Sequence, residues 1–331
     1  YSRRSGVRDC ERFDIPAELG LRIGRKSLPE DGTGLTVLLF DKPARAGMHV
    51  CSGAAGTRQC DSLSADHVVQ HVSALLFSGG SSFGLDASGG VIRHLREKGV
   101  GTQTPYGVVP SCPTAVIFDI GFKKHCAAPT ADDAYEACIN ASMQSLGCGS
   151  VGAGTGATVG KLKGMSCAMK GGEGLALYAG DGLFVLALAV VNSYGEVFMP
   201  ELGKVLAGMR KSADSLELEN SLELVRSGGY LAGGGLSNTT LLAIVTNAAL
   251  DKSACSRVAR MASAGIARSI RPAFTPADGD IVFCFSCGEH QAGQATLGAI
   301  AAEISEQAIR RAVITADGLG VIPAHKDVYI E

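Results

Sequence analysis

The feature that most constrains the fold is a glycine-rich loop that leads directly into an apolar, β-branched run. Residues 233–235 are three successive glycines, and residues 239–247 follow shortly afterwards as Thr-Thr-Leu-Leu-Ala-Ile-Val-Thr-Asn. Aliphatic and β-branched side chains in a short run are typical of a buried strand. The chain has 331 residues, which is long enough to enclose such a strand in a large core.

The composition is that of a globular protein whose core is built from small aliphatic side chains. Hydrophobic residues make up 46%, aromatic residues only 5%, and tryptophan is absent. Glycine is abundant, 44 of 331 residues, where about 7% is usual. The net charge of -2 provides no electrostatic footprint for nucleic acid or an anionic membrane. The longest apolar run, residues 183–191, is also too short for a membrane helix.

The eleven cysteines predict neither a disulfide framework nor a metal site. Their number is odd and several lie in apolar runs, so we expect reduced, mostly buried thiols and a cytoplasmic protein. Cys284, Cys287 and His290 form a C-x-x-C-x-x-H cluster. A structural zinc site needs four ligands and no second pair follows at a suitable spacing, so we expect no metal and no cofactor.

Hydrophobic periodicity predicts strands and helices along the chain. We expect strands at 35–40 (closed by Pro43), 116–120, 183–191, 239–247 and 280–286. We expect helices from Ser64 onward, after the glycine turn up to 98, and at 130–145, 251–270 and 294–313.

Two glycine-rich segments are candidate ligand loops. One contains Gly79 and Gly80, and the other runs from Gly152 to Gly160 and ends on Lys161. Backbone N–H groups that glycines leave uncovered can hold a carboxylate, a phosphate or a developing oxyanion. Tight packing turns and surface loops have the same composition, and the first segment lacks the ending of a P-loop.

The Asn238-Thr239 bond is a candidate for self-cleavage. A threonine hydroxyl is a weak nucleophile until a base lies beside it, and breaking the preceding peptide bond creates an α-amine that can serve as that base. Such an amine titrates near neutral pH. The same residues are also typical of a loop that enters a strand, and the motif alone favours that interpretation over self-cleavage.

Five motifs occur in an order that resembles the L-aminopeptidase/D-esterase family, which includes β-peptidyl aminopeptidases and 6-aminohexanoate-oligomer hydrolases. They are Gly79-Gly80-x-x-x-Gly84-Leu85, the 152–161 run, Asn192, Asn238-Thr239-Thr240 and Asp278-Gly279-Asp280. The resemblance extends over roughly residues 20–315.

The resemblance implies an α/β fold, a four-layer αββα sandwich that forms a single catalytic domain over residues 1–331. It also implies cleavage between Asn238 and Thr239 into fragments 1–238 and 239–331, which stay together in a homo-oligomer of processed units. The substrates would be small peptides or amides.

The resemblance further implies a role for each site residue. Thr239 would attack the substrate carbonyl, Asn192 would donate to the oxyanion, and Lys161 would keep the α-amine uncharged. The pair Asp278 and Asp280 would orient the hydroxyl and relay protons. The substrate and oxyanion neighbourhood would include Gly79, Gly80, Phe118 and Gly160.

The substrate is less constrained than the self-cleavage. Some relatives have a Ser/Glu pair in place of Asp278 and Asp280, and several have a tyrosine at the position of Phe118, whose ring offers no hydroxyl. An aminopeptidase and an endo-acting amidase therefore both remain open. Two further alternatives are an acyltransferase of the ornithine acetyltransferase type and an uncleaved homologue without enzymatic activity.

Overall fold

The computed structural model describes residues 12–228 and 238–329. The glycine-rich loop that precedes Asn238, with its three glycines at 233–235, lies outside these residues. Strands account for most of the described regular structure. The longer strands are β1 (Leu21–Leu28), β2 (Thr33–Val50), β4 (Val72–Ser78), β10 (Gly172–Gly180), β11 (Leu183–Asn192), β14 (Thr239–Ala248) and β16 (Ile281–His290). The shorter ones are β3 (Thr57–Arg58), β5 (Thr102–Thr104), β6 (Gly107–Val109), β7 (Thr114–Val116), β8 (Thr158–Val159), β9 (Met169–Lys170), β12 (Glu196–Met199), β13 (Lys204–Ala207) and β15 (Ile270–Arg271).

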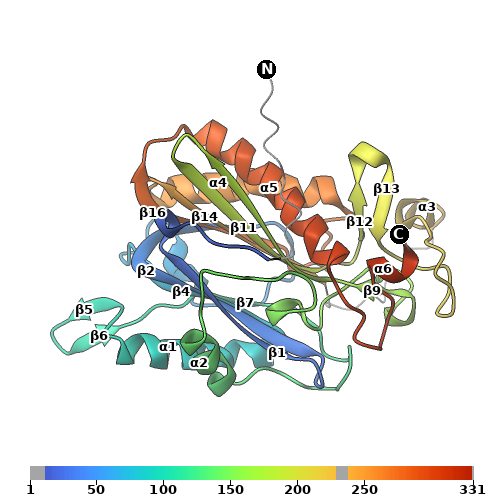
Figure 1. Ribbon diagram of the computed structural model, residues 1–331, viewed down its shortest axis with the longest axis horizontal. Helices are drawn as coiled ribbons and strands as arrows, with labels where there is room; N and C mark the ends of the chain where they lie inside the picture. Colours follow the sequence, from blue (N-terminus) through green and yellow to red (C-terminus); the bar gives the residue numbers. More distant parts are fainter. Residues whose placement is uncertain (1–11, 229–237, 330–331) are drawn as a thin grey trace.

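The helices occupy both outer faces of the strand layers and one end of the molecule (Figure 1). They are α1 (Ser88–Glu97), α2 (Ala131–Ile139), α3 (Ser221–Arg226), α4 (Lys252–Ser269), α5 (Gln294–Ile314) and α6 (His325–Val328). Helix α2 begins at the capping box that Thr130 and Asp133 form, and α4 begins behind the Asp251 cap, where the sequence predicts both starts.

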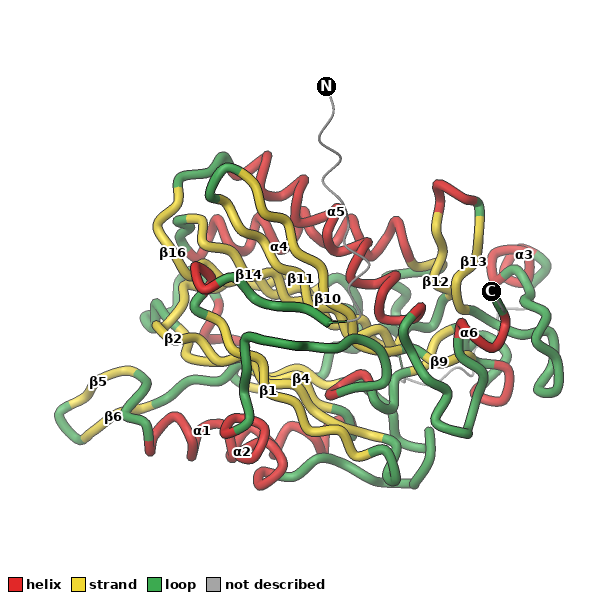
Figure 2. Tube along the Cα trace, viewed as in Figure 1, coloured by secondary structure: helices red, strands yellow, loops and turns green. Residues whose placement is uncertain are grey.

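Four layers are visible in the trace, in the order α4 and α5, strands, strands, α1 and α2 (Figure 2). Within the described residues, nine strands form one sheet along the path β10-β11-β14-β16-β2-β4-β7-β3, with β1 paired to β2, and the remaining strands form three smaller sheets. Strand β2 connects the two strand layers, since residues 45–50 pair with β16 and residues 33–44 pair with β1 and β4. The expected αββα sandwich is therefore confirmed.

Three hydrophobic clusters fill the three spaces between these layers. In β14, Leu242 and Ile244 pack with α4 and α5, while Leu241, Ala243 and Val245 pack between the two strand layers. The third cluster lies between β2, β4 and helices α1 and α2. Because successive side chains of a strand point to opposite faces, β14 is buried on both sides.

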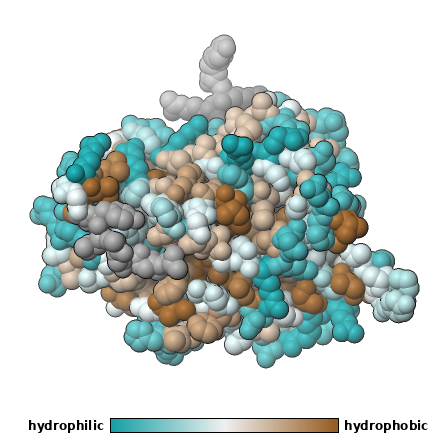
Figure 3. All heavy atoms as spheres, turned by 180° about the vertical axis from the view of Figure 1, so that it is seen from behind, coloured by the Kyte–Doolittle hydropathy of each residue, from teal (hydrophilic) through white to brown (hydrophobic). Residues whose placement is uncertain are grey.

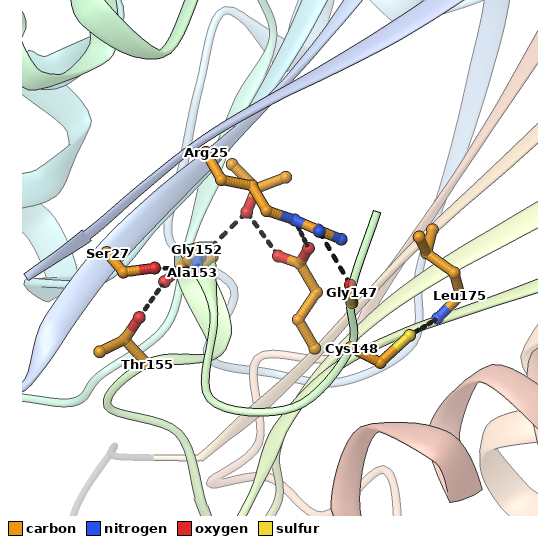
Figure 4. Close-up of polar contacts among 10 residues, drawn as sticks. Arg25, Ser27, Gly147, Cys148, Gly152, Ala153, Thr155 and Leu175 are labelled. Carbon is orange, nitrogen blue, oxygen red and sulfur yellow. Dashed lines mark hydrogen bonds and ion pairs between the residues drawn. The ribbon is translucent and has the colours of Figure 1, made fainter. Parts of the chain in front are cut away.

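A buried ion pair joins the two strand layers (Figure 4). Arg25 on β1 donates from Nε to Glu173 on β10 at 2.6 Å, and from Nη1 to the carbonyl of Gly147 at 2.8 Å. The other carboxylate oxygen of Glu173 accepts from the Thr36 hydroxyl. The Glu173 side chain is completely buried, so its charge depends on these partners.

Four expectations about secondary structure differ from the structure. The strand expected at 116–120 shares only Val116 with β7, and the helix expected at 130–145 ends at Ile139. No helix begins at Ser64, because Val68 and Val69 lie in a loop and the apolar residues from Val72 onward belong to β4. Pro43 does not close the first long strand, since β2 continues to Val50 through a register shift between Leu39 and Ala44. A proline is tolerated at such an irregularity because no ladder hydrogen bond is required from its nitrogen.

The surface mixes apolar with polar residues. Figure 3 shows brown apolar residues in several separate places among teal polar ones on the face opposite to Figure 1. The β5–β6 hairpin projects from the body, and Tyr106 at its tip is 99% exposed. No helix within the described ranges is long and apolar enough to cross a membrane.

Candidate active site

Thr239 is the first residue of β14 and lies directly opposite Asn192, the last residue of β11. Its side chain shares the face of Leu241 and therefore points between the two strand layers. The hydroxyl Oγ1 donates to the carbonyl oxygen of Asn238 at 2.5 Å. The hydroxyl of Thr239 thus lies against the peptide bond that precedes it.

Thr240 points to the opposite face, toward α4 and α5, as the alternation along the strand requires. Its backbone N–H donates to Asp280 Oδ1 at 2.6 Å, and its side chain is completely buried. Of the two threonines, only Thr239 has its hydroxyl on the face between the two strand layers, next to Asn192 at the end of β11.

The side chain of Asn192 is fixed by hydrogen bonds from both ends of its amide. Nδ2 donates to the carbonyl of Phe118 at 3.0 Å. Oδ1 accepts from the Thr158 N–H and from Lys161 Nζ, each at 3.0 Å. The amide is completely buried, so its orientation is set by these neighbours. Phe118 therefore contributes to the site through its carbonyl group.

Lys161 is 5% exposed and reaches Asn192 from the end of the glycine run. Nζ donates to both the backbone carbonyl and Oδ1 of Asn192, each at 3.0 Å. Burial lowers the pKa of Lys161 to about 7, although the carboxylates of Asp278, Asp119 and Asp280 act in the opposite direction. Burial therefore makes the charged form of Lys161 less favourable than that of an exposed lysine.

Asp278 and Asp280 flank Gly279 in the turn before β16. Asp278 Oδ2 accepts from the backbone N–H and the hydroxyl of Thr275, at 2.8 and 2.7 Å. Asp280 accepts from the Thr240 N–H at Oδ1 and from the Phe274 N–H, at 3.2 Å, at Oδ2. Burial raises the pKa of both carboxyls, that of Asp280 to about 7.

These bonds differ from the expected orientation of the Thr239 hydroxyl. The Asp278 carboxylate accepts from Thr275 and from the backbone N–H of Tyr194, and the Asp280 carboxylate accepts from Thr240 and Phe274. The hydrogen bond of the Thr239 hydroxyl goes to Asn238. Both carboxylates thus hold the backbone around the threonine.

The glycine loops pack closely and use their N–H groups within the protein. Gly79 donates to Gly34 O at 2.8 Å, Gly80 to Asp119 Oδ1 at 2.6 Å, and Gly160 to Gly195 O at 3.0 Å. Because these N–H groups already have acceptors, this arrangement does not make them the anion cradle that the glycine pattern suggested. A Cβ on Gly79 would lie 2.2 Å from Asp119 Oδ2, so the glycine serves close packing.

Sequence reasoning missed two side chains that support the site. Asp119 holds Gly80 and the Thr33 hydroxyl, the latter at 2.7 Å, and burial raises its pKa to about 6. Lys170 is completely buried, and its Nζ donates to the carbonyls of Gly154, Ala157 and Gly171 at 2.8 to 3.0 Å. Nothing in the surrounding residue pattern distinguishes these two side chains from surface charges.

Two other kinds of site, a surface depression and a metal centre, are alternatives to the cluster around Thr239. A shallow depression of about 470 Å³ is lined by residues of the C-terminal segment, from Asp317 to Asp327, and by none of the candidate residues. Across residues 12–228 and 238–329, no group of three or more His, Cys, Asp or Glu side chains is arranged to hold a metal ion. The buried cluster around Thr239 is thus the candidate site.

Known proteins resemble the chain over nearly its full length. The model of peptidase family S58 matches residues 14–326. An uncharacterized aminopeptidase of Mycobacterium tuberculosis is 36% identical over 94% of this chain and 96% of its own. A 6-aminohexanoate-oligomer endohydrolase of Agromyces sp. is 28% identical over 93% and 87%.

Solved structures share the fold. A β-aminopeptidase of Burkholderia sp. has a TM-score of 0.68 at 21% identity, and the match covers 98% of this chain and 93% of that one. The L-aminopeptidase D-Ala-esterase/amidase of Ochrobactrum anthropi, described as a variant of the Ntn hydrolase fold, has a TM-score of 0.70 at 17% identity, with 95% and 89% covered. From the family match over residues 14–326, the chain belongs to peptidase family S58.

Proposed function

We propose that this member of the S58 peptidases cleaves itself between Asn238 and Thr239 and then hydrolyses small peptides or amides with Thr239 as its nucleophile. The observation that carries the proposal is the contact of 2.5 Å between Thr239 Oγ1 and the carbonyl oxygen of Asn238. A hydroxyl in this position needs only a local movement to attack the adjoining carbonyl carbon. The products would be fragments 1–238 and 239–331.

In the processed enzyme, the new α-amine of Thr239 acts as the base for its own hydroxyl. Lys161 supports this role because a second positive charge nearby lowers the pKa of the amine. Asn192, directly opposite Thr239, supplies an amide donor for the tetrahedral oxyanion. No group in this scheme is a metal or cofactor.

A substrate can reach Thr239 only if the residues that bury it move after the chain is cut. The residue is 4% exposed and Asn238 only 2%. Both polar atoms of the Asn238 side chain are buried and have no hydrogen-bond partner among residues 12–228 and 238–329, an arrangement that costs about 1–3 kcal/mol per group. Cleavage gives Asn238 a free end and a charge, and we propose that it then leaves the site and admits substrate.

The substrate class follows from the relatives and remains part of the proposal. The similar proteins are named as an aminopeptidase and as an endohydrolase of 6-aminohexanoate oligomers. We therefore propose amide bonds of short peptides or amide oligomers as substrates. We also propose a cytoplasmic homo-oligomer of processed units, as expected from the cysteines and the family.

The test combines processing with turnover. Purified protein is incubated with aminoacyl anilides, short β-peptides and 6-aminohexanoate oligomers, with and without an added amine as acyl acceptor. A hydrolase releases free acid in both cases, whereas a transferase forms acyl-amine product and little acid. If the Thr239→Ala variant hydrolyses these amides as fast as the wild type, the proposed nucleophile is wrong.

A further inference from the structure

The carbonyl oxygen of Asn238 accepts two hydrogen bonds, and one of them comes from Gly279. The Gly279 N–H donates to this oxygen at 2.8 Å, while the Thr239 hydroxyl donates to it at 2.5 Å. Asn238 and Asp278 also form a parallel bridge, which places the Asp278–Asp280 turn alongside the proposed scissile bond. A backbone donor is therefore already bound to the oxygen on which negative charge would develop.

We propose that the Gly279 N–H is the oxyanion donor of the self-cleavage step, and that Asp278 and Asp280 are positioning residues that hold this N–H in place. The inference rests on the proposed function, because it assumes that the 238–239 bond is cut. It assigns self-cleavage a donor distinct from the side chain of Asn192.

Self-cleavage proceeds through an ester and needs no reagent other than the water that hydrolyses this ester. Thr239 Oγ1 forms a bond to the Asn238 carbonyl carbon, and the electron pair of the C=O bond moves to the oxygen held by Gly279. The C–N bond then breaks, and the hydroxyl proton ends on the Thr239 nitrogen, which becomes the α-amine. Water hydrolyses the resulting ester, leaving a carboxylate on Asn238 and a free hydroxyl on Thr239.

The turn around Gly279 is fixed on both sides. On one side, the carbonyl of Asp278 accepts from the Ala54 N–H at 2.8 Å, while its carboxylate is bound by Thr275. On the other side, the Asp280 N–H donates to Ser52 Oγ at 2.6 Å, while its carboxylate is bound by the Thr240 N–H. Since Thr240 follows the nucleophile, the carboxylate of Asp280 ties the donor turn to the threonine.

Steric contacts also explain why residue 279 is a glycine. A Cβ built on it would lie 2.7 Å from Thr239 Oγ1 and 2.9 Å from the carbonyl oxygen of Ala54. The second neighbour is backbone and cannot rotate away. Any side chain would therefore press on the nucleophile, so the Asp-Gly-Asp motif combines two anchors with a donor that leaves the hydroxyl its space.

The test replaces a single N–H. Cell-free translation with a tRNA charged with glycolic acid places an ester in the bond between residues 278 and 279, which removes the Gly279 N–H and weakens the Asp278 carbonyl as the acceptor for Ala54. The matched control uses lactic acid at Ala54, which removes the hydrogen bond from Ala54 to the Asp278 carbonyl in the same turn. The same tRNA charged with glycine restores the wild type. Conversion of the labelled full-length chain to the two fragments is followed in time, and trypsin resistance of the uncut chain reports folding.

We expect the ester at 279 to slow cleavage by about 10²- to 10³-fold, the effect of removing one oxyanion donor elsewhere. The chain with the ester at residue 54 should cleave itself at close to the rate of the restored wild-type chain. Equal rates for the ester at 279 and the restored chain, or equal slowing by both esters, would overturn the inference. A restored chain that stays uncut would instead refute the proposed self-cleavage.

Two substitutions at Asp278 provide a second test if trypsin digests the chain with the ester at 279, which would mean that this chain is not folded. Asp278→Ala removes the acceptor for Thr275 and should slow cleavage, whereas Asp278→Asn keeps an oxygen acceptor and should restore most of the lost rate. If Asp278→Asn is as slow as Asp278→Ala, the carboxylate acts through its charge, and the positioning role is wrong.

Discussion

Replacing Asn192 by aspartate tests the proposed oxyanion donor with almost no change in shape. The oxygen that accepts from Lys161 and Thr158 is kept, but the Nδ2 donor is lost. Loss of one such donor costs about 10²–10³ in rate, or about 2.7–4 kcal/mol of transition-state stabilisation. The Phe118 carbonyl also loses its partner in a fully buried position, which costs about 1–3 kcal/mol of folding stability.

Asn247 provides a matched control on β14, near the end of that strand opposite to Thr239. Its Nδ2 donates to the carbonyl of Gly182 at 2.8 Å and its Oδ1 accepts from the Phe184 N–H at 2.8 Å. Asn247→Asp therefore causes a similar loss of stability far from Thr239. We expect both variants to show a lower melting temperature in calorimetry, and only Asn192→Asp to lose amide hydrolysis per processed molecule. Equal kcat values for the two variants would refute the assignment of Asn192.

Three further predictions follow from contacts of the site and the core. Thr239→Ala should remain a single chain on a denaturing gel while Thr240→Ala still cleaves, because only the first hydroxyl faces the Asn238 carbonyl; cleavage of Thr239→Ala would exclude it as the nucleophile. Lys161→Ala should move the acidic limb of the pH profile of kcat/KM to higher pH. Lys161, with its pKa of about 7, carries its charge mainly below neutral pH, and that charge lowers the pKa of the α-amine; an unmoved limb would contradict this role. Glu173→Ala should cost about 3–5 kcal/mol in chemical denaturation because it leaves Arg25 buried without its carboxylate. As a control, Asp41→Ala removes the exposed partner of Arg22 and should cost at most about 1 kcal/mol of stability. Equal losses of stability in the two variants would contradict the prediction for the buried pair of Arg25 and Glu173.

Long periodic segments of the fold were predictable because their signals are local. Helices α4 and α5 and strand β11 occur at the predicted residues, since cap residues and continuous apolar patterns are written within each segment. The segment after Ser64 was misjudged because the spacing of its valines and leucines fits a helix as well as a strand. Pairing of β4 with β2 decides between them, and that contact is not local.

The candidate site was predictable as a set of residues, but its arrangement was not. The motifs named Thr239, Asn192, Lys161 and the Asp-Gly-Asp turn, and the structure places Asn192 and Asp278 against Thr239 and Asn238. The partner of each polar group depends on strand register and on glycine contacts between distant segments. For this reason Gly80, expected to face a ligand, instead donates to Asp119.

The most direct test of the central claim is the intact mass of the purified wild-type protein under denaturing conditions. We expect two species, residues 1–238 and residues 239–331, the second beginning with a free Thr239 amine. A single chain of 331 residues that persists after prolonged incubation at neutral pH would contradict self-cleavage at this bond.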